Sequence, residues 1–251
     1  MIDFHSHILP GIDDGSSDIR ESLEMLRLCV QNGVETVVLT PHCYYTDDSD
    51  IKAFIHDRNA KFRTLKEEIA KLNEPMPQLL LGCELHLNKA HAKSAFLKEL
   101  AMEGTSYIML EMPMGKWEPE LYDAIYSISI KGLRPLMAHI DRYWYEHEKD
   151  FHNLFSLDLS YQVNCDSFLH SRMKRKVPYF FERGAIHVLG SDMHNLTTRT
   201  THMSECCDII KNKYGENYLS FIHANANRIL HNEETIIHSF PKMTFMQKIK
   251  L

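Results

Sequence analysis

Short apolar runs alternate with longer stretches of helical spacing from one end of this 251-residue chain to the other. Several runs are apolar on successive residues, which is typical of parallel strands that helices cover on both faces. The alternation therefore predicts repeated βα units and an α/β fold. Seven strands are expected, over residues 2–5, 34–40, 79–84, 107–112, 135–139, 161–164 and 187–190.

The stretches between these runs carry apolar side chains at the spacing of helix faces that pack on a core. Ser17 is expected to cap the first helix and Gly33 to end it. Further helices are expected over residues 90–101, 120–131, 168–183, 203–214 and 216–230. The side chains expected to face the core are Leu23, Leu26 and Val30 in the first helix, and Phe54, Phe62, Leu65, Ile69 and Leu72 in the second.

No linker, low-complexity tract or internal repeat interrupts the alternation, so residues 1–251 are predicted to form a single domain. Residues 231–251 mix apolar and basic side chains and are expected to pack on this domain or to fray from it. Use of this tail in an oligomer contact or at a membrane surface is the less favoured alternative.

The composition excludes several classes of function. With 44% hydrophobic and 25% charged residues, the chain has the composition of a soluble protein that buries a full core. A formal net charge of −6 argues against nucleic-acid binding, because phosphate backbones attract clustered Lys and Arg. The amino terminus lacks the pattern of a signal peptide and no apolar run reaches membrane-spanning length, so we expect a cytoplasmic protein without membrane insertion.

The six cysteines form no C-x-x-C pair, which removes zinc ribbons and thioredoxin-like motifs from consideration. No cysteine is followed six positions later by arginine, so the phosphate loop of the cysteine-dependent phosphatases cannot be built here. Glycine-rich phosphate-binding motifs are also missing from the sequence.

Imidazole and carboxylate side chains stand at or just after the ends of the predicted strands. In a closed parallel barrel the carboxyl ends of all strands point to one rim, so these side chains are expected to converge. Nine nitrogen and oxygen donors are enough for two or three metal ions with open positions for water and substrate. The nine residues are His5, His7, Asp14, His42, Glu84, Glu111, His139, Asp192 and His194.

Taken singly, each of these residues has an ordinary structural interpretation. The His5-x-His7 pair is as typical of two surface histidines as of a metal site, and a glutamate at a strand end is usually solvated or salt-bridged. The joint placement at successive strand ends favours a metal centre. His86 and His91 stay undecided, and the histidines predicted to lie on the surface are His56, His147, His152, His202, His223, His231 and His238.

Five short motifs carry a resemblance to a known family: residues 5–16 (HSHILPGIDDGS), 40–42 (TPH), 82–84 (GCE), 139–142 (HIDR) and 190–195 (GSDMHN). They resemble the metal-dependent tyrosine phosphatases of the polymerase-and-histidinol-phosphatase (PHP) superfamily, which serve bacterial capsule and exopolysaccharide synthesis. The resemblance extends to about Arg199. It implies a distorted TIM-like barrel of seven βα units and hydrolysis of phosphotyrosine on a tyrosine kinase with a tyrosine-rich C-terminal tail.

The resemblance also implies a centre of three divalent metal ions, often manganese, although iron, zinc and cobalt suit the same ligands. By this resemblance, His5, His7, Glu84 and Asp192 would hold the first ion. Glu84 would bridge to a second ion completed by Glu111 and His139, and Asp14, His42 and His194 would hold the third. Asp13 is the alternative to Asp14.

Two arginines follow the ligand motifs and are candidates for catalysis and phosphate binding. Arg142 comes three residues after His139, and Arg199 comes five residues after His194, so both are expected in loops at the rim. A planar guanidinium there can bind two phosphate oxygens at once. The neighbouring Tyr143–Tyr145 segment is expected either to form a wall for an aromatic ring or to pack the loop.

These features together predict a phosphoric monoester hydrolase in which a metal-bound hydroxide attacks phosphorus and expels the tyrosyl oxygen. A small-metabolite phosphatase of the histidinol-phosphate type and a phosphodiesterase remain alternatives, because the same metal centre would serve them. An inactive metal-binding scaffold is a further alternative. An amidohydrolase ranks last, because Glu111 stands where that class has a bridging lysine.

Overall fold

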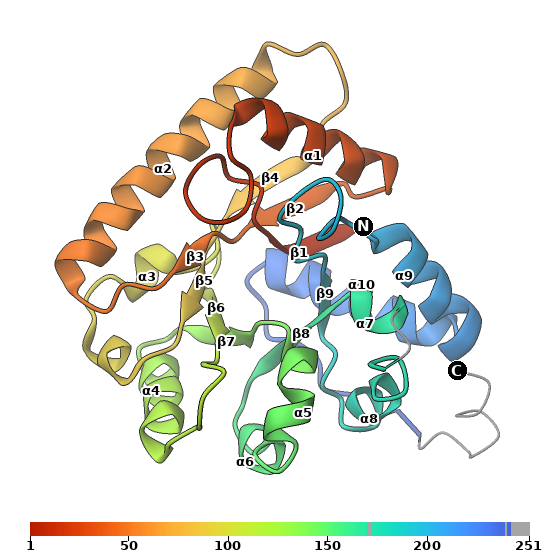
Figure 1. Ribbon diagram of the computed structural model, residues 1–251. Coiled ribbons are helices and arrows are strands. Elements are labelled where there is room, and N and C mark those ends of the chain that lie inside the picture. The colour runs from red at the N-terminus through yellow and green to blue at the C-terminus, as the bar shows by residue number, and fades with distance from the viewer. Residues whose placement is uncertain (170–171, 239, 242–251) are drawn as a thin grey trace.

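Seven parallel strand segments form a distorted barrel in the computed structural model, which describes residues 1–169, 172–238 and 240–241 (Figure 1). Two of these segments are interrupted, so that β3 continues β2 and β5 continues β4 along the chain. The strands are β1 (Ile2–Ser6), β2 (Thr36–Leu39), β3 (His42–Cys43), β4 (Gln78–Leu81), β5 (Glu84–His86), β6 (Tyr107–Glu111), β7 (Arg134–Met137), β8 (Ser160–Asn164) and β9 (Val188–Gly190).

The two interruptions lie side by side, because β2 pairs with β4 and β3 pairs with β5. Pro41 has no backbone N–H and cannot donate to the ladder. Isolated backbone hydrogen bonds connect the strands at the break. The Gly82 amide donates to Leu39 O at 2.8 Å, and the Glu84 amide donates to Pro41 O at 3.0 Å. The ladder therefore divides into one sheet of order β1-β2-β4 and another of order β3-β5-β6-β7-β8-β9.

The first and last segments close the barrel. Ser6 in β1 forms a parallel bridge with Met193, just after β9. The His7 amide donates to Met193 O and the Asp192 amide donates to His5 O, both at 2.8 Å. The expected α/β barrel of seven βα units is thus confirmed, with every predicted strand present.

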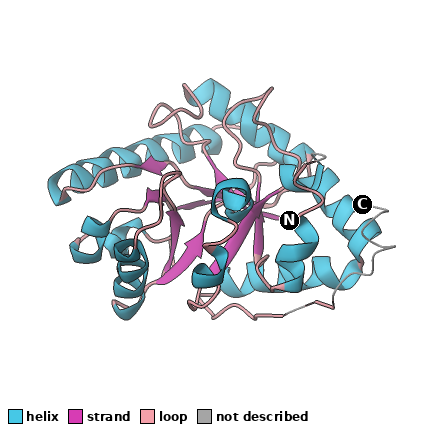
Figure 2. Ribbon diagram, turned by 60° about the horizontal axis from the view of Figure 1, so that its bottom comes forward, coloured by secondary structure: helices cyan, strands magenta, loops and turns pink. Residues whose placement is uncertain are grey.

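Helices surround the strands on the outside (Figure 2). Two long helices, α1 (Ile19–Gln31) and α2 (Asp48–Ala70), cover one side of the barrel. A third long helix, α10 (Glu216–Leu230), passes behind the strands in Figure 1. The other helical segments are η1 (Lys89–Lys93), α3 (Leu97–Leu100), α4 (Pro119–Ile130), η2 (Ile140–Tyr143), α5 (Trp144–His147), α6 (Phe151–Leu154), α7 (Asp166–Leu169), α8 (Val177–Glu182), α9 (Met203–Ile209) and η3 (Ile210–Tyr214).

The predicted cap of the first helix is wrong by one residue. Asp18 is the N-cap of α1, because its carboxylate accepts a hydrogen bond from the Glu21 amide at 2.9 Å. The Ser17 hydroxyl donates instead to the Glu21 side chain at 2.7 Å. Gly33 follows the helix with φ of +72°, a conformation that favours glycine and supports the predicted stop.

Two predicted helices are interrupted. The stretch 90–101 divides into η1 and α3 around Ser94, which is extended and donates from its hydroxyl to the Asp48 carboxylate at 2.6 Å. The stretch 168–183 divides into α7 and α8, and residues 170–171 lie outside the described residues. Pro178 stands in the first turn of α8, a position where proline is tolerated at the start of a helix.

The segment after α10 packs on the barrel over its described length. The Asn225 side chain accepts from the Ile236 amide at 2.7 Å and donates to Ile236 O at 3.1 Å. The buried Phe240 ring stacks on Tyr218 with ring centroids 3.7 Å apart. Residues 242–251 of the predicted tail lie outside the described residues. Within the described ranges, no helix combines the length and the apolar character needed to cross a bilayer.

Candidate metal centre

The carboxyl ends of the strands bring the nine predicted ligand residues to one rim of the barrel. In three overlapping groups, the candidate ligand atoms lie within 4.8 Å of one another. These groups consist of His5, His7 and Glu84, of His7, Asp14, His42 and His194, and of His42, Glu84 and Glu111. His139 and Asp192 complete the cluster through contacts with the first group.

Glu84 occupies the middle of the cluster and is fully buried. Its Oε2 lies 3.1 Å from His5 Nε2 and 3.0 Å from His42 Nδ1, while its Oε1 lies 2.6 Å from His139 Nε2. Burial opposes ionisation, but the charges of His5 and His139 hold the pKa of Glu84 well below its usual range. A carboxylate with imidazoles around both oxygens is suited to bridging two cations.

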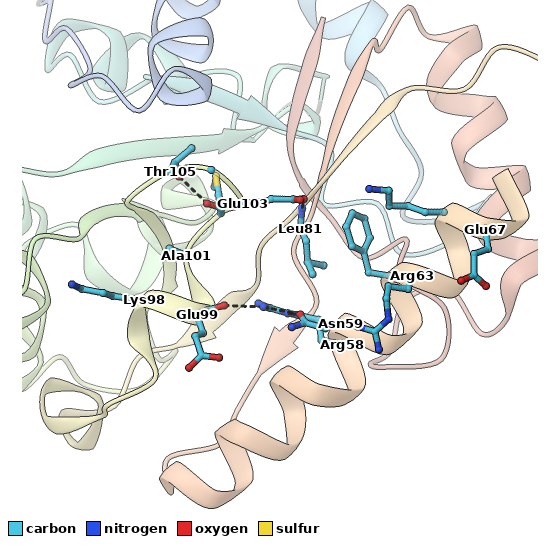
Figure 3. A pocket seen from close by; sticks show the side chains of 14 residues that line it. Arg58, Asn59, Arg63, Glu67, Leu81, Lys98, Glu99, Ala101, Glu103 and Thr105 are labelled. Atoms are coloured by element: carbon cyan, nitrogen blue, oxygen red, sulfur yellow. Dashed lines mark hydrogen bonds between the residues drawn. The ribbon is translucent and has the colours of Figure 1, made fainter. Parts of the chain in front are cut away.

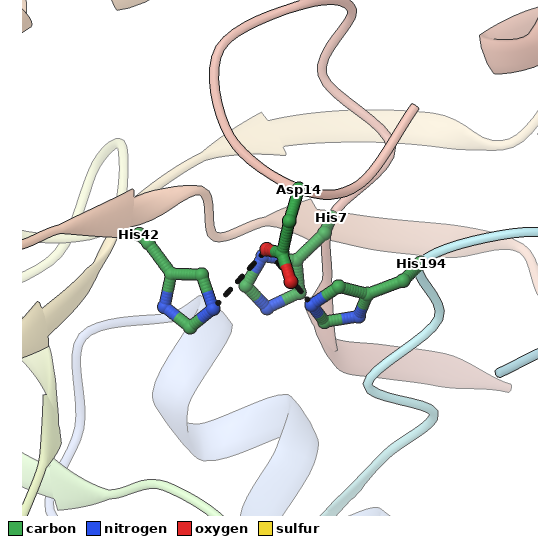
Figure 4. Close-up of side chains that lie close together, drawn as sticks. All are labelled: His7, Asp14, His42 and His194. Carbon is green, nitrogen blue, oxygen red and sulfur yellow. Dashed lines mark ion pairs between the residues drawn. The ribbon is translucent and has the colours of Figure 1, made fainter. Parts of the chain in front are cut away.

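His7, His42 and His194 lie around the Asp14 carboxylate, which is largely exposed (Figure 4). Asp14 Oδ1 lies 3.5 Å from His42 Nε2 and 3.4 Å from His194 Nε2. Asp13, the alternative from the sequence, points elsewhere: its Oδ2 lies 2.7 Å from His7 Nδ1 and accepts from the His42 amide at 3.0 Å. Asp13 therefore orients the His7 ring and leaves His7 Nε2 facing the cluster, a role typical of carboxylates behind metal-binding histidines.

Asp13 and His7 also shift each other's pKa. Burial lowers the pKa of His7, but hydrogen bonds to Asp13 and Glu84 outweigh it and raise this pKa to about 10. Burial likewise opposes the ionised form of Asp13, but its hydrogen bond to His7 brings the pKa down to about 2. The two opposite shifts favour a protonated His7 ring paired with an ionised Asp13.

Glu111 marks the far side of the cluster. Its Oε1 lies 3.5 Å from His139 Nε2, and its Oε2 lies 2.9 Å from His86 Nδ1. The hydrogen bond to Glu111 raises the pKa of His86, one of the two histidines that the sequence left undecided. The other, His91, is buried and donates from Nε2 to Tyr45 O at 2.8 Å, so its role is structural.

The donor atoms fit divalent metal ions. His5 Nε2 and His7 Nε2 lie only 3.0 Å apart and both face Glu84. Among the described residues, the buried His194 Nε2 has no hydrogen-bond partner. Converging imidazole nitrogens and carboxylate oxygens are the ligands that manganese, iron, zinc and cobalt accept. The assignment of individual residues to individual ions stays a prediction.

Polar side chains of β8 hold the cluster from behind, and the sequence analysis missed them. Gln162 Oε1 accepts from the His139 amide at 2.6 Å and lies 3.1 Å from His5 Nδ1. Asn164 donates from Nδ2 to Asp192 Oδ2 at 3.0 Å and accepts from the Gln162 amide group at 2.8 Å. The signal was present, because two polar residues two positions apart in a buried strand point to the same face.

The backbone is strained at two of the predicted ligands. His139 has φ of +28° and Asp192 has φ of +54°, a region that non-glycine residues rarely adopt. Gly190, just before the Asp192 turn, approaches β1 so closely that a Cβ would lie 2.5 Å from His5 Cβ. This close approach requires glycine and sets the depth of the cluster.

Both predicted arginines border the cluster. Arg142 Nη2 lies 3.2 Å from Asp192 Oδ2, and Arg199 Nη2 lies 3.0 Å from Asp192 Oδ1. The two guanidinium side chains are 38% and 34% exposed, respectively, so they remain accessible to an anion. With Asn164, Ser167 and other residues they line a cavity of about 260 Å³ beside the predicted metal ligands.

Of the two alternatives for the segment after Arg142, loop packing holds for two of its three residues. Tyr143 is fully buried, and its hydroxyl accepts from the Met112 amide at 2.9 Å. Trp144 is also buried, whereas the Tyr145 side chain is exposed. His147, predicted on the surface, is buried as well and stacks on Trp117 with ring centroids 4.1 Å apart, because α5 turns it toward the core.

A larger cavity, of about 660 Å³, lies elsewhere, between α2 and the segment from Lys98 to Thr105 (Figure 3). Arg58 spans this region, donating from Nη1 to Gly82 O at 3.1 Å and from Nη2 to Glu99 O at 2.8 Å. The buried Arg58 thus ties α2 to the break between β4 and β5 and to α3. None of the nine predicted ligands lines this cavity.

Comparisons with known proteins agree with this geometry. The family model described as "Capsular polysaccharide synthesis, CpsB/CapC" matches residues 1–231. The tyrosine-protein phosphatase CpsB of Streptococcus pneumoniae is 30% identical over 236 residues, covering 86% of this chain and 91% of its own. The tyrosine-protein phosphatase YwqE of Bacillus subtilis (strain 168) is 27% identical over 258 residues, covering 99% and 98% respectively.

One solved structure matches almost the whole fold. It is described as belonging to YwqE from Bacillus subtilis and CpsB from Streptococcus pneumoniae, unique metal-dependent tyrosine phosphatases. The TM-score is 0.79 at 25% sequence identity, and the match covers 97% of this chain and 100% of the other.

Proposed function

Because the chain belongs to the CpsB/CapC family of capsular polysaccharide synthesis, we propose that it is a metal-dependent tyrosine-protein phosphatase. One observation carries the proposal: nine candidate ligand residues, Glu84 and Asp14 among them, cluster beside a cavity that two arginines line. The relatives are named tyrosine-protein phosphatases and match nearly the full length of this chain.

The residues divide into three proposed ligand sets for divalent ions, with manganese as the proposed metal. His5, His7, Glu84 and Asp192 would hold one ion, and Glu84 would be shared with a second that Glu111 and His139 complete. Asp14, His42 and His194 would hold the third. When bound, such ions supply positive charge for phosphoryl oxygens and make an ionised water available near neutral pH.

The two arginines would bind the phosphoryl oxygens. Asp192 accepts from Arg199 at 3.0 Å and lies 3.2 Å from Arg142, which holds both guanidinium groups at the mouth of the cavity. Their remaining N–H groups can make paired hydrogen bonds to phosphate. This pairing would place the phosphorus beside the ligand cluster with its charge compensated on two sides.

The proposed substrate is a phosphorylated tyrosine kinase of capsule or exopolysaccharide synthesis, with its phosphotyrosines in a C-terminal tail. A tyrosyl oxygen has a pKa near 10 and leaves more readily than an alkyl oxygen. The open cavity beside exposed Arg142 and Arg199 admits a side chain from a flexible segment. This supports a protein tail as substrate.

The deciding experiment measures hydrolysis of p-nitrophenyl phosphate and of a phosphotyrosine peptide, with and without added manganese, alongside elemental analysis. We expect turnover of both substrates, and loss of turnover in His42→Ala and Asp192→Ala. Histidinol phosphate and bis-p-nitrophenyl phosphate form the comparison arms for a metabolite phosphatase and a phosphodiesterase. Failure of the metal-reconstituted protein on both phosphotyrosine-type substrates would overturn the proposal.

A further inference from the structure

A second cavity, of about 430 Å³, lies at the same end of the barrel as the phosphate cavity. It is lined by Tyr145, Arg172, Arg175 and Lys176, which we call the basic groove. Tyr145 belongs to α5, after β7, and the three cations belong to the turn before α8, after β8. Both segments follow the carboxyl ends of their strands, as the ligand residues do.

The basic groove adjoins the proposed phosphate site through one turn of chain. Met173, between Arg172 and Lys176, lines the 260 Å³ cavity together with Arg142 and Arg199. The same turn thus contributes to the walls of both cavities. A peptide with its phosphotyrosine between Arg142 and Arg199 would pass its neighbouring residues along this turn.

The cations of the basic groove lack carboxylate partners in the part of the chain that the structure describes. Within the described ranges, no ion pair involves Arg172, Arg175 or Lys176, and the Lys176 ammonium instead lies 4.7 Å from the centre of the Trp144 ring. Some other surface cations do pair with carboxylates, as Arg27 does with Glu74 at 2.6 Å. Three neighbouring cations without a counter-charge repel one another, so an anionic ligand would bind there favourably.

We propose that the basic groove binds acidic side chains that flank the phosphotyrosine of a peptide substrate. The inference rests on the proposed phosphatase function and adds the substrate's sequence context to it. Arg172 and Arg175 are exposed and can reach glutamate or aspartate carboxylates, while the Tyr145 ring, 60% exposed, offers an apolar face to the peptide. The groove determines preference among peptides and takes no part in the chemistry.

The expected effect is moderate and lies mainly in KM. Exposed cation–carboxylate contacts are individually weak, so the two arginines together should lower KM for an acidic peptide by about 3- to 10-fold. Because such contacts are screened by salt, this advantage should shrink as ionic strength rises from about 0.05 M to 0.5 M. The kcat value should change little, since the phosphate contacts are the same for every peptide.

The test compares two phosphotyrosine peptides that differ only in flanking residues, glutamate in one and glutamine in the other. Wild type should favour the glutamate peptide, and Arg172→Ala/Arg175→Ala should bring the ratio of KM values close to one. Arg63→Ala/Lys98→Ala is the matched control, because it removes two exposed charges from the cavity beside α2 and should retain the preference. Hydrolysis of p-nitrophenyl phosphate, which is too small to reach the groove, reports the chemistry separately.

Binding of the same two peptides carrying a non-hydrolysable phosphonate, followed by fluorescence anisotropy, gives a readout that needs no turnover. If wild type hydrolyses nothing, the proposed function fails, while the anisotropy ratio still decides the groove. Equal affinity of wild type for both peptides would overturn the inference. So would a preference that survives in Arg172→Ala/Arg175→Ala, or one that appears only when a second phosphotyrosine replaces the glutamates.

Discussion

The two ends of the barrel both carry polar side chains, but they use them differently. At the amino end the groups satisfy one another: the Tyr107 hydroxyl donates to Glu233 O at 2.7 Å, and Arg134 donates to Asn232 O at 2.8 Å. At the carboxyl end, His5 and His7 turn ring nitrogens toward each other and toward Glu84. Polar groups at one end pair with one another, whereas at the other end candidate metal-binding atoms converge.

The buried histidines of the two ends show the same contrast. His187, just before β9, is fully buried with its Nδ1 accepting from the Tyr161 amide, and burial alone lowers its pKa to about 4. Burial also acts on His139 at the carboxyl end, but Glu84 and Glu111 raise its pKa to about 9. The carboxylates beside His139 thus account for the difference between its pKa and that of His187.

The largest expected effect comes from removing the central charge of the carboxyl end. Glu84→Gln keeps the side-chain shape but loses the carboxylate that contacts His5, His42 and His139. We expect kcat/KM for p-nitrophenyl phosphate with manganese to fall by about 10³-fold or more, together with bound metal. Steady-state kinetics and elemental analysis check this. Activity within about threefold of wild type would contradict the assignment of Glu84.

The next effect concerns the arginines at the cavity. Arg199→Ala and Arg142→Ala each remove a donor aimed at the proposed phosphoryl oxygens, and each should lower kcat/KM by about 10²-fold. Lysine at either position should restore part of the loss, because it keeps the charge but not the two-pronged hydrogen bonding. Unchanged kinetics in both alanine variants would place phosphate binding elsewhere.

A smaller effect, on the pH dependence of stability, is expected from the buried His187 at the amino end of the barrel. His187 has a pKa of about 4 in the folded protein, against about 6.5 when unfolded. Between these values the unfolded chain binds a proton that the folded chain does not, so stability falls as pH drops from about 6.5 to 4. This contributes a loss of about 2 kcal/mol at pH 5 relative to pH 7.

His187→Asn keeps an acceptor for the Tyr161 amide but does not titrate in this range. Urea unfolding at pH 7 and pH 5 should therefore show a smaller loss of stability in the variant than in wild type. The pH dependence that the two proteins share, from other groups, cancels in this comparison. Equal losses would show that burial of His187 does not couple to folding.

The smallest effect, on the free energy of unfolding, is expected from the hydrogen-bonded side chains at the amino end of the barrel. Arg134→Ala removes hydrogen bonds to Asn232 and should lower the free energy of unfolding by about 1 kcal/mol. Because the change lies at the end opposite the metal centre, kcat/KM should stay within about twofold of wild type. A large fall in kcat/KM without loss of stability would contradict the view that Arg134 serves stability alone.

Much of this architecture could be predicted from the sequence, because strand periodicity and strand ends are local properties. The nine candidate ligands all lie at one rim, since parallel strands deliver their carboxyl ends to the same side. Their roles as ligands remain predictions. One prediction failed because adjacent polar residues compete for the same position: Asp18, and not Ser17, caps α1. Another failed because the short helix α5 turns His147 toward the core.

By itself, the sequence determined the βα order, the strand ends and the residue types that gather there. Tertiary structure alone decided which aspartate faces His42 and His194 and which one orients His7, because Asp13 and Asp14 differ only in the direction that the loop gives them. Strand periodicity placed Gln162 and Asn164 on one face of β8, and the tertiary structure turned that face toward the centre. Side-chain direction and hydrogen-bond partners depend on contacts between distant segments, which periodicity does not encode.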